Sequence, residues 1–276
     1  MRSREAEFER KLAQTGLWQL PDLLQTLPDE TARLACLCYA ASPVSDWLDT
    51  PPEVFFSCAA HARYLRENVS WTRALPEPLF LAYVLHPRVN NEALCDCRPV
   101  FYAALAERLR GLPEEAAILE INRWCAEHVA YQPTDERTRS ALAVLRAGFG
   151  RCGEESMFAV NVLRACGFAA RQVYVPRWAH CDDNHAWVEV RCGGAWHFLG
   201  ACEPEAVLDR GWFNSAAGRA VLVHSRCFGE PEPGADLIGR EGDVVYCNET
   251  ARYADVRRLT VRVTDENGMS AAGADV

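Results

Sequence analysis

Lysine, net positive charge and long apolar runs are all scarce in this sequence. Lys11 is the single lysine among 29 basic residues, and 38 acidic residues bring the net charge to −9. A protein that binds a phosphate backbone needs a basic face, so this balance argues against a nucleic-acid partner. The first sixteen residues are rich in charge and lack the apolar stretch of a signal peptide, and no run is long enough to cross a membrane. We therefore expect a cytoplasmic protein with no nucleic-acid partner and no membrane partner.

Cysteine pairs at zinc-site spacing are also missing, although cysteine itself is abundant. The 13 cysteines are odd in number and irregularly spaced, which argues against a disulfide framework in a chain of 276 residues. Two C-x-C pairs occur, Cys36 with Cys38 and Cys95 with Cys97, but neither has a second pair at the spacing of a zinc ribbon. We expect buried free thiols, no metal and no cofactor.

The chain is long enough for one large core, or for one core with a smaller satellite domain, because 49% of its residues are hydrophobic. We expect a helical N-terminal region over residues 1–113, a catalytic core over 114–230 and a β-rich extension over 231–276. In the extension, alternating apolar residues predict strands at 243–246 and 259–263. The final residues resemble the opening of a carboxypeptidase-regulatory-like β-sandwich repeat, so we expect a fragment of a longer protein. We also expect a monomer.

The core should combine a buried helix with a small antiparallel sheet, which makes the fold class α+β. One helix is predicted over 114–128, and a second begins at Cys152 and ends near Cys166, where Gly167 is a stop signal. Apolar residues occupy most of the circumference of the second helix, so it should be buried. Short strands are predicted at 168–175, 185–191 and 196–199, the last two joined by a Gly193-Gly194 turn.

Cys152 is the candidate nucleophile. The glycine-rich run A-G-F-G-R-C-G delivers it to the first turn of the buried helix, where partial positive charge and free N–H groups should lower the pKa of the thiol and favour the thiolate. Gly150 and Gly153 leave the thiol uncrowded, so that a substrate carbonyl can approach backbone N–H donors. Cys166, at the far end of the helix, should be an inert core thiol.

His185 is the candidate base because it begins an alternating strand after the polar loop W-A-H-C-D-D-N, which would expose it at the rim of a cleft. His180, within this loop, is a candidate for substrate contact. A third group should orient the imidazole by accepting its other N–H. Glu203 is the nearest carboxylate after the third strand and is our candidate, with Asp183 and Glu189 as alternatives.

Four runs together resemble the transglutaminase-like superfamily with all spacings intact: G-R-C-G-E at 150–154, L-R-A-C-G-F-A-A-R-Q-V at 163–173, N-H-A-W-V-E-V at 184–190 and W-H-F-L-G-A-C-E at 196–203. The resemblance implies a papain-like fold, a Cys-His-Asp triad and acyl transfer on amide bonds, with Cys152 as nucleophile and His185 as base. The family's acid falls four residues after the tryptophan, where this chain has Gly200. We expect Glu203 to reach the imidazole instead, or the site to work as a dyad.

Within the superfamily, the G-R-C-G-E and C-E runs look most like the peptide:N-glycanase branch, and the longer context looks like bacterial transglutaminase-domain proteins. We expect a hydrolase of peptide or glycopeptide amides, in which Cys152 attacks the carbonyl, His185 protonates the leaving amine and water resolves a thioester. Tyr174, Trp178 and His180 are the candidate substrate-binding residues. Two alternatives stay open: acyl transfer to an amine, as in cross-linking transglutaminases, and a binding or scaffold module whose site has decayed.

Overall fold

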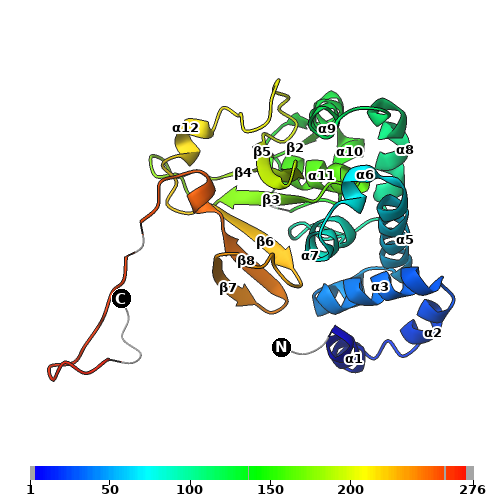
Figure 1. Ribbon diagram of the computed structural model, residues 1–276, viewed down its shortest axis with the longest axis horizontal. Helices are drawn as coiled ribbons and strands as arrows, with labels where there is room; N and C mark the ends of the chain where they lie inside the picture. The colour runs from blue at the N-terminus through cyan, green and yellow to red at the C-terminus, as the bar shows by residue number, and fades with distance from the viewer. Residues whose placement is uncertain (1–3, 136, 258, 272–276) are drawn as a thin grey trace.

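The N-terminal half of the chain is helical (Figure 1). The computed structural model describes residues 4–135, 137–257 and 259–271. The helices of this half are α1 (Arg4–Thr15), α2 (Leu20–Gln25), α3 (Asp29–Ala41), α4 (Val44–Asp49), α5 (Pro52–Asn68), α6 (Ser70–Arg73), α7 (Glu77–Phe80), the π-helical turn η1 (Leu81–Leu85) and α8 (Arg98–Leu109). Several begin directly after an extended proline, because proline cannot continue a preceding helix but suits the start of the next.

The central part of the chain leads into the buried helix. Its elements are α9 (Glu114–His128), β1 (Ala130–Tyr131), α10 (Ala141–Ala147), β2 (Phe149–Gly150) and α11 (Cys152–Ala165). The short strands β1 and β2 pair in parallel, which anchors the turn that precedes Cys152. The helix predicted over 114–128 is confirmed, and the one predicted from Cys152 to Cys166 ends one residue earlier.

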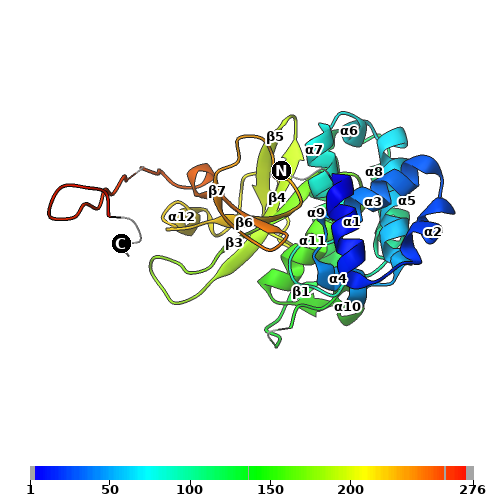
Figure 2. The same ribbon diagram turned by 90° about the horizontal axis from the view of Figure 1, so that it is seen from below.

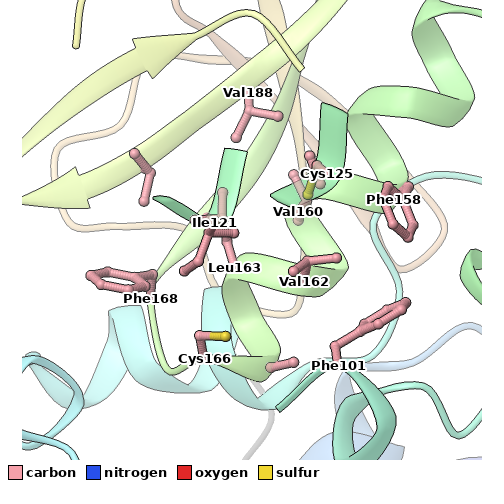
Figure 3. Close-up of a cluster of buried hydrophobic side chains, with 14 of the residues drawn as sticks. Phe101, Ile121, Cys125, Phe158, Val160, Val162, Leu163, Cys166, Phe168 and Val188 are labelled. Carbon is pink, nitrogen blue, oxygen red and sulfur yellow. The ribbon is translucent and has the colours of Figure 1, made fainter. Parts of the chain in front are cut away.

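Helix α11 is buried around its whole circumference, as its apolar pattern predicted. Every residue from Gly153 to Ala165 is buried, and the apolar ones form a core with α8, α9 and the sheet (Figure 3). In Figure 3, Phe101 of α8 and Val188 of the sheet lie on different sides of the helix. This packing fixes the position of the helix N-terminus, and therefore of Cys152.

A six-stranded antiparallel sheet lies beside the helices (Figure 2). Its strands are β3 (Ala170–Val175), β4 (His185–Cys192), β5 (Ala195–Leu199), β6 (His224–Phe228), β7 (Leu237–Glu241) and β8 (Val244–Asn248), in the order β5-β4-β3-β6-β8-β7. The turn between β4 and β5 uses Gly193 and Gly194, both at positive φ, as the sequence predicted. Strand β6 was not predicted, yet it joins the two halves of the sheet. The remaining elements are α12 (Asn214–Ala217) and η2 (Thr250–Arg252).

The N-terminal helices pack against the half of the sheet that contains β6 and β8. Buried apolar residues of α1, α3 and α5 share one cluster with Cys227 of β6 and Val245 of β8. Lys11, which is fully buried, forms an ion pair of 2.8 Å with Asp243, in the turn between β7 and β8. Strand β8 is therefore part of the packed body, with the exposed β7 paired at its edge, while the division expected at residue 231 stays a prediction.

The fold class is α+β, with a helical N-terminal region and a small antiparallel sheet, as predicted. The strand predicted at 259–263 is wrong: these residues belong to no strand, and the segment extends away from the body in both views (Figures 1 and 2). Few of its side chains have a packing surface, and Leu259 is 84% exposed. Alternation alone does not make a strand where no neighbouring strand is available. No helix among the described residues combines the length and apolar character needed to span a membrane.

Candidate active site

Cys152 is the first residue of α11, and the run G-R-C-G-E explains why the helix begins there. Arg151 is extended, and the side chain of Glu154 accepts from its backbone N–H at 3.3 Å. Glu154 also accepts from Thr134 Oγ1 at 2.7 Å and from Arg139 Nε at 2.8 Å. A Cβ on Gly150 would lie 2.9 Å from Glu154 Cβ, so only glycine fits beside this buried carboxylate.

The Cys152 thiol is half-buried, and its pKa differs from our expectation. Burial raises the pKa of the Cys152 thiol above its ordinary value, although the backbone N–H groups of Ala186 and Gly153 and the charge of Arg151 act to lower it. The expected resting thiolate is therefore wrong for the free protein. The helix N-terminus does stabilise negative charge, but the loss of water around the sulfur outweighs it.

His185 is the first residue of β4, but it is only 8% exposed, so the expectation that the preceding loop exposes it at the rim of a cleft is wrong. Its ring lies 4.8 Å from the ring of Trp212, 5.2 Å from that of Phe213 and 6.3 Å from that of Trp178. This apolar enclosure lowers the pKa of His185 to about 4, with a small opposing contribution from the charge of Asp183. The imidazole is therefore neutral at pH 7 and free to accept a proton.

The structure brings Cys152 close to the start of β4, but no hydrogen bond joins it to the His185 ring among the described residues. The contact is made through Ala186, whose backbone N–H acts on the sulfur and which directly follows His185. Because side chains alternate along a strand, Ala186 and His185 point to opposite faces of the sheet. The thiol therefore lies against the backbone of the residue that follows His185, while the His185 side chain is directed to the opposite face of the sheet.

Glu203 occupies the space of the missing family acid. A Cβ on Gly200 would lie 2.2 Å from Glu203 Oε2, so this carboxylate lies where a side chain at position 200 would begin. The loop is held by Asn122 of α9, which donates to the carbonyl oxygens of Gly200 at 2.9 Å and Glu203 at 3.1 Å and accepts from Cys202 N at 3.0 Å. The Glu203 carboxylate therefore has a fixed position next to Gly200.

Glu203 does not bond to His185 directly within the described part of the chain. Its Oε1 accepts from Trp212 Nε1 at 3.0 Å, and the Trp212 ring lies against the His185 ring. Its Oε2 is buried with no hydrogen-bond partner among the described residues. Burial raises the pKa of Glu203, and the charge of Glu205 adds to this. Trp212, which sequence reasoning missed, is the link between the carboxylate and the imidazole.

Glu155 is a further buried carboxyl group that sequence reasoning missed. It lies three residues after Cys152, hence on the same side of α11, and is 5% exposed. Burial and the nearby charge of Glu203 raise its pKa to about 8. The only sequence signal was a second glutamate in G-R-C-G-E-E, at a position whose neighbours in the helix are buried.

The two alternative acids have other partners. Glu189 is fully buried and accepts from Arg171 Nε, Arg252 Nε and Tyr253 Oη, each at 2.7 Å. It therefore belongs to a structural ion-pair network. The carboxylate of Asp183 accepts from the backbone N–H of the next residue at 2.7 Å and is exposed.

The predicted substrate-binding residues lie in two different places. Trp178 and His180 line a cavity of about 560 Å³ formed by the loop after β3. Trp178 is only 5% exposed and belongs to an apolar cluster with Trp187, whereas His180 is exposed. Tyr174 lines another cavity, of about 240 Å³, together with Gly153 and Ala186 on either side of Cys152. No group of three or more His, Cys, Asp or Glu side chains suited to a metal ion occurs in the described ranges.

Comparison with known proteins supports the family resemblance. Residues 103–201 match the family model of the transglutaminase-like superfamily, a match that includes Cys152 and His185 and stops short of Glu203. This segment is therefore transglutaminase-like, as its motifs predicted, which supports a cysteine-dependent enzyme family. A solved structure described as "a putative cysteine protease from Cytophaga hutchinsonii" is similar at 14% identity and a TM-score of 0.39, covering 67% of this chain and 68% of that chain. No curated protein shows significant similarity.

Proposed function

We propose that this protein is a cysteine-dependent amide hydrolase that acts on peptide or glycopeptide substrates through a thioester acyl-enzyme. The observation that carries the proposal is the position of Cys152, at the head of a buried helix and against the backbone N–H of the residue that follows His185. The nucleophile then lies against backbone N–H donors and one residue along β4 from a neutral base, and we infer that the imidazole turns round the end of the strand to meet the sulfur during acyl transfer.

Both reacting groups are neutral in the resting protein, so the proton moves as the sulfur attacks. The Cys152 sulfur bonds to the amide carbonyl carbon while its proton passes to the His185 imidazole. The tetrahedral oxyanion is stabilised by backbone N–H donors at the head of α11. The C–N bond then breaks, and the leaving amine takes the proton from His185. Water, deprotonated by the same imidazole, hydrolyses the thioester to the acid and regenerates the thiol.

We assign the orientation of the imidazole to Trp212 and Glu203 acting together. The indole N–H of Trp212 donates to the Glu203 carboxylate, and its ring face contacts the His185 ring. By holding the Trp212 ring against the imidazole, the Glu203 carboxylate can position His185 without touching it. This replaces the direct hydrogen bond that the acid of a triad accepts from the histidine. Glu203 is then a positioning residue, and the missing aspartate at position 200 does not require a decayed site.

Mass spectrometry of a defined mixture of synthetic peptides and N-glycosylated peptides tests the proposal. Incubation in H₂¹⁸O should give products with one ¹⁸O in the new carboxyl group, because water resolves the thioester. Cys152→Ala should lower the rate by about a thousandfold or more, and His185→Ala by about a hundredfold or more. Cys36→Ser, which alters a partly exposed thiol of α3 in the N-terminal helical region, is the matched control and should leave the rate unchanged.

The same experiment separates the alternatives. A cross-linking transferase would join an added primary amine, such as dansylcadaverine, to the acyl product in preference to ¹⁸O-labelled water. A scaffold module would turn over none of the peptides and show no acyl adduct on Cys152 in intact-mass spectra. Equal turnover by the wild-type protein and Cys152→Ala would overturn the proposal.

A further inference from the structure

A polar cavity opens beside Cys152, on the face of the sheet that is turned toward α11. It has a volume of about 240 Å³, and its wall includes Gly153 of α11 and Ala186 of β4, which both contact the nucleophile. Strand pairing sets His224 of β6 opposite Tyr174 of β3, and Tyr174 opposite Ala186. This row of three residues crosses about two strand spacings, or about 10 Å, from His224 to the residue whose N–H contacts the sulfur.

The charged side chains that line this cavity are arginines, in a protein whose net charge is −9. Arg151 and Arg226 contribute to its wall, and no Asp or Glu of the described residues does. Arg226 lies two residues after His224 on β6, so it points to the same side of the sheet. Its guanidinium donates to Asn90 Oδ1 and lies over the ring of Tyr246, and it forms no ion pair with a carboxylate in the described part of the chain.

A buried hydrogen-bonding atom in the same wall has no partner. His224 Nδ1 is buried and makes no hydrogen bond to any described residue. Burial, and to a lesser degree the charge of Arg226, lower the pKa of His224, so the ring is neutral at pH 7 and can present an N–H. An orphaned buried polar atom is costly unless a ligand or water satisfies it.

A chain of hydrogen bonds connects the wall of the cavity to the start of α11, where the nucleophile lies. Asn90 connects Arg226 to Gln172: its Oδ1 accepts from the Arg226 guanidinium, and its Nδ2 donates to Gln172 Oε1 at 2.7 Å. Gln172 in turn donates to the Gly153 carbonyl oxygen at 2.9 Å and to Ser156 Oγ at 2.7 Å, both in the first turns of α11. Any group held by Arg226 is thereby placed at a fixed distance from the head of the helix.

We propose that this cavity is a specificity site for a carboxylate that the substrate carries close to the amide that is cleaved. Arg226 supplies the charge and a planar pair of N–H donors, which match a carboxylate. His224 and the hydroxyl of Tyr174 supply further hydrogen bonds on the same wall. The inference rests on the proposed function, because it names the class of peptide that Cys152 attacks: one with an acidic side chain or a free C-terminus next to the reacting amide.

Alkylation by paired probes tests the site without knowledge of the natural substrate. Iodoacetylglycine and iodoacetylglycinamide have the same length, and only the first ends in a carboxylate. Alkylation rates are measured at pH 8.5 by peptide mapping. Cys152 should react several-fold faster with iodoacetylglycine than with the amide, while exposed Cys181 should show no such preference. A second pair, iodoacetylaspartic acid α-amide and iodoacetylasparagine amide, distinguishes a side-chain carboxylate from a C-terminal one.

Substitutions of arginine separate Arg226 from the general positive field of the helix N-terminus. Arg226→Gln should abolish most of the preference for the acid, and Arg226→Lys should retain part of it, which excludes loss of folding as the cause. Arg219→Gln, an equal charge change at an exposed arginine whose side chain donates to the Ser215 carbonyl oxygen of its own segment, should have no effect.

The outcomes also distinguish failure of this site from failure of the proposed function. Rapid alkylation of Cys152 by both probes with equal rates would overturn the carboxylate site and leave the hydrolase proposal intact. A preserved preference in Arg226→Gln would overturn it as well. Peptide turnover that is independent of Cys152 would instead overturn the hydrolase proposal, whatever the ratio of the two probes.

Discussion

The two faces of strands β3 and β4 place neighbouring residues in opposite environments. On the face toward α11, Tyr174 and Ala186 border a polar cavity with an arginine in its wall. On the other face, His185 and Trp187 are packed among aromatic rings. Because successive side chains of a strand point to opposite faces, the candidate base His185 lies on the apolar face, whereas Ala186, whose N–H contacts the Cys152 sulfur, lies on the polar face. The difference shows that the base is controlled by packing, and the thiol by backbone N–H groups and burial.

The largest effect should come from breaking the buried ion-pair network on the aromatic face. Glu189→Gln keeps the shape of the side chain but removes the charge that Arg171 and Arg252 share, and it leaves Arg171 with Glu249, at 2.7 Å, as its remaining carboxylate partner. We expect a loss of about 3–5 kcal/mol in the free energy of unfolding, measured by urea denaturation at pH 7. Glu205→Gln, on an exposed pair with Arg210, should change stability by less than about 0.5 kcal/mol. An equally small loss in Glu189→Gln would refute the assignment of this residue to structure.

The same network predicts how stability depends on pH. Burial acts to raise the pKa of Glu189, but the charges of Arg171 and Arg252 outweigh it and hold the pKa below its ordinary value. A depressed pKa contributes stability that is complete above the unfolded pKa of about 4.3 and is lost as pH falls through the folded value. The difference in stability between wild type and Glu189→Gln should therefore narrow below pH 4. A constant difference across that range would contradict this.

A smaller effect is expected from restoring the family acid. Gly200→Asp adds a Cβ that would lie 2.2 Å from Glu203 Oε2, so we expect a destabilisation of about 1–3 kcal/mol. Adding Glu203→Ala removes the obstacle, and the double variant should recover most of that loss in a double-mutant cycle. Additive costs would show that Glu203 does not occupy the space of the missing side chain. Faster turnover by the double variant than by Glu203→Ala alone would show that a direct triad is compatible with this site.

The aromatic enclosure of His185 can be opened at its exposed edge. Trp212 is 64% exposed yet lies 4.8 Å from the imidazole, so Trp212→Leu should admit water and raise the pKa of His185 from about 4 toward about 6.5. NMR titration of the imidazole Cε1–H signal measures this shift directly. Trp18→Leu removes an indole that is 65% exposed in the N-terminal region and should leave the titration unchanged. An unshifted His185 signal in Trp212→Leu would show that Trp212 does not control the base.

The features that could be predicted from the sequence are those that depend on local interactions. Helix α11 and strands β3 to β5 were predictable because periodicity and glycine positions are local signals. Strand β6 was missed because its short run H-S-R-C-F has little alternation, and its pairing with β3 depends on contacts distant in sequence. Glu155 and Arg226 were missed for the same reason: the polar partners that give them a role come from other elements. The raised pKa of Cys152 was missed because a helix N-terminus is visible in sequence and the burial of a sulfur is not.

The smallest predicted effect compares Cys152 with a second half-buried thiol. The pKa of Cys95 is lowered to about 6 by hydrogen bonds, chiefly from the Cys97 thiol and also from the backbone N–H groups of Leu142 and Ala141, which outweigh its burial. At pH 7 Cys95 is then mostly thiolate, but a thiolate of lower pKa is a weaker nucleophile. We expect iodoacetamide to alkylate Cys95 only several-fold faster than Cys152 at pH 7, and we expect the labelling rate of Cys152 to overtake that of Cys95 as the pH rises. Faster labelling of Cys152 at pH 7 would show instead that its thiol is already ionised in the resting protein, and that burial does not outweigh the backbone N–H groups around the sulfur.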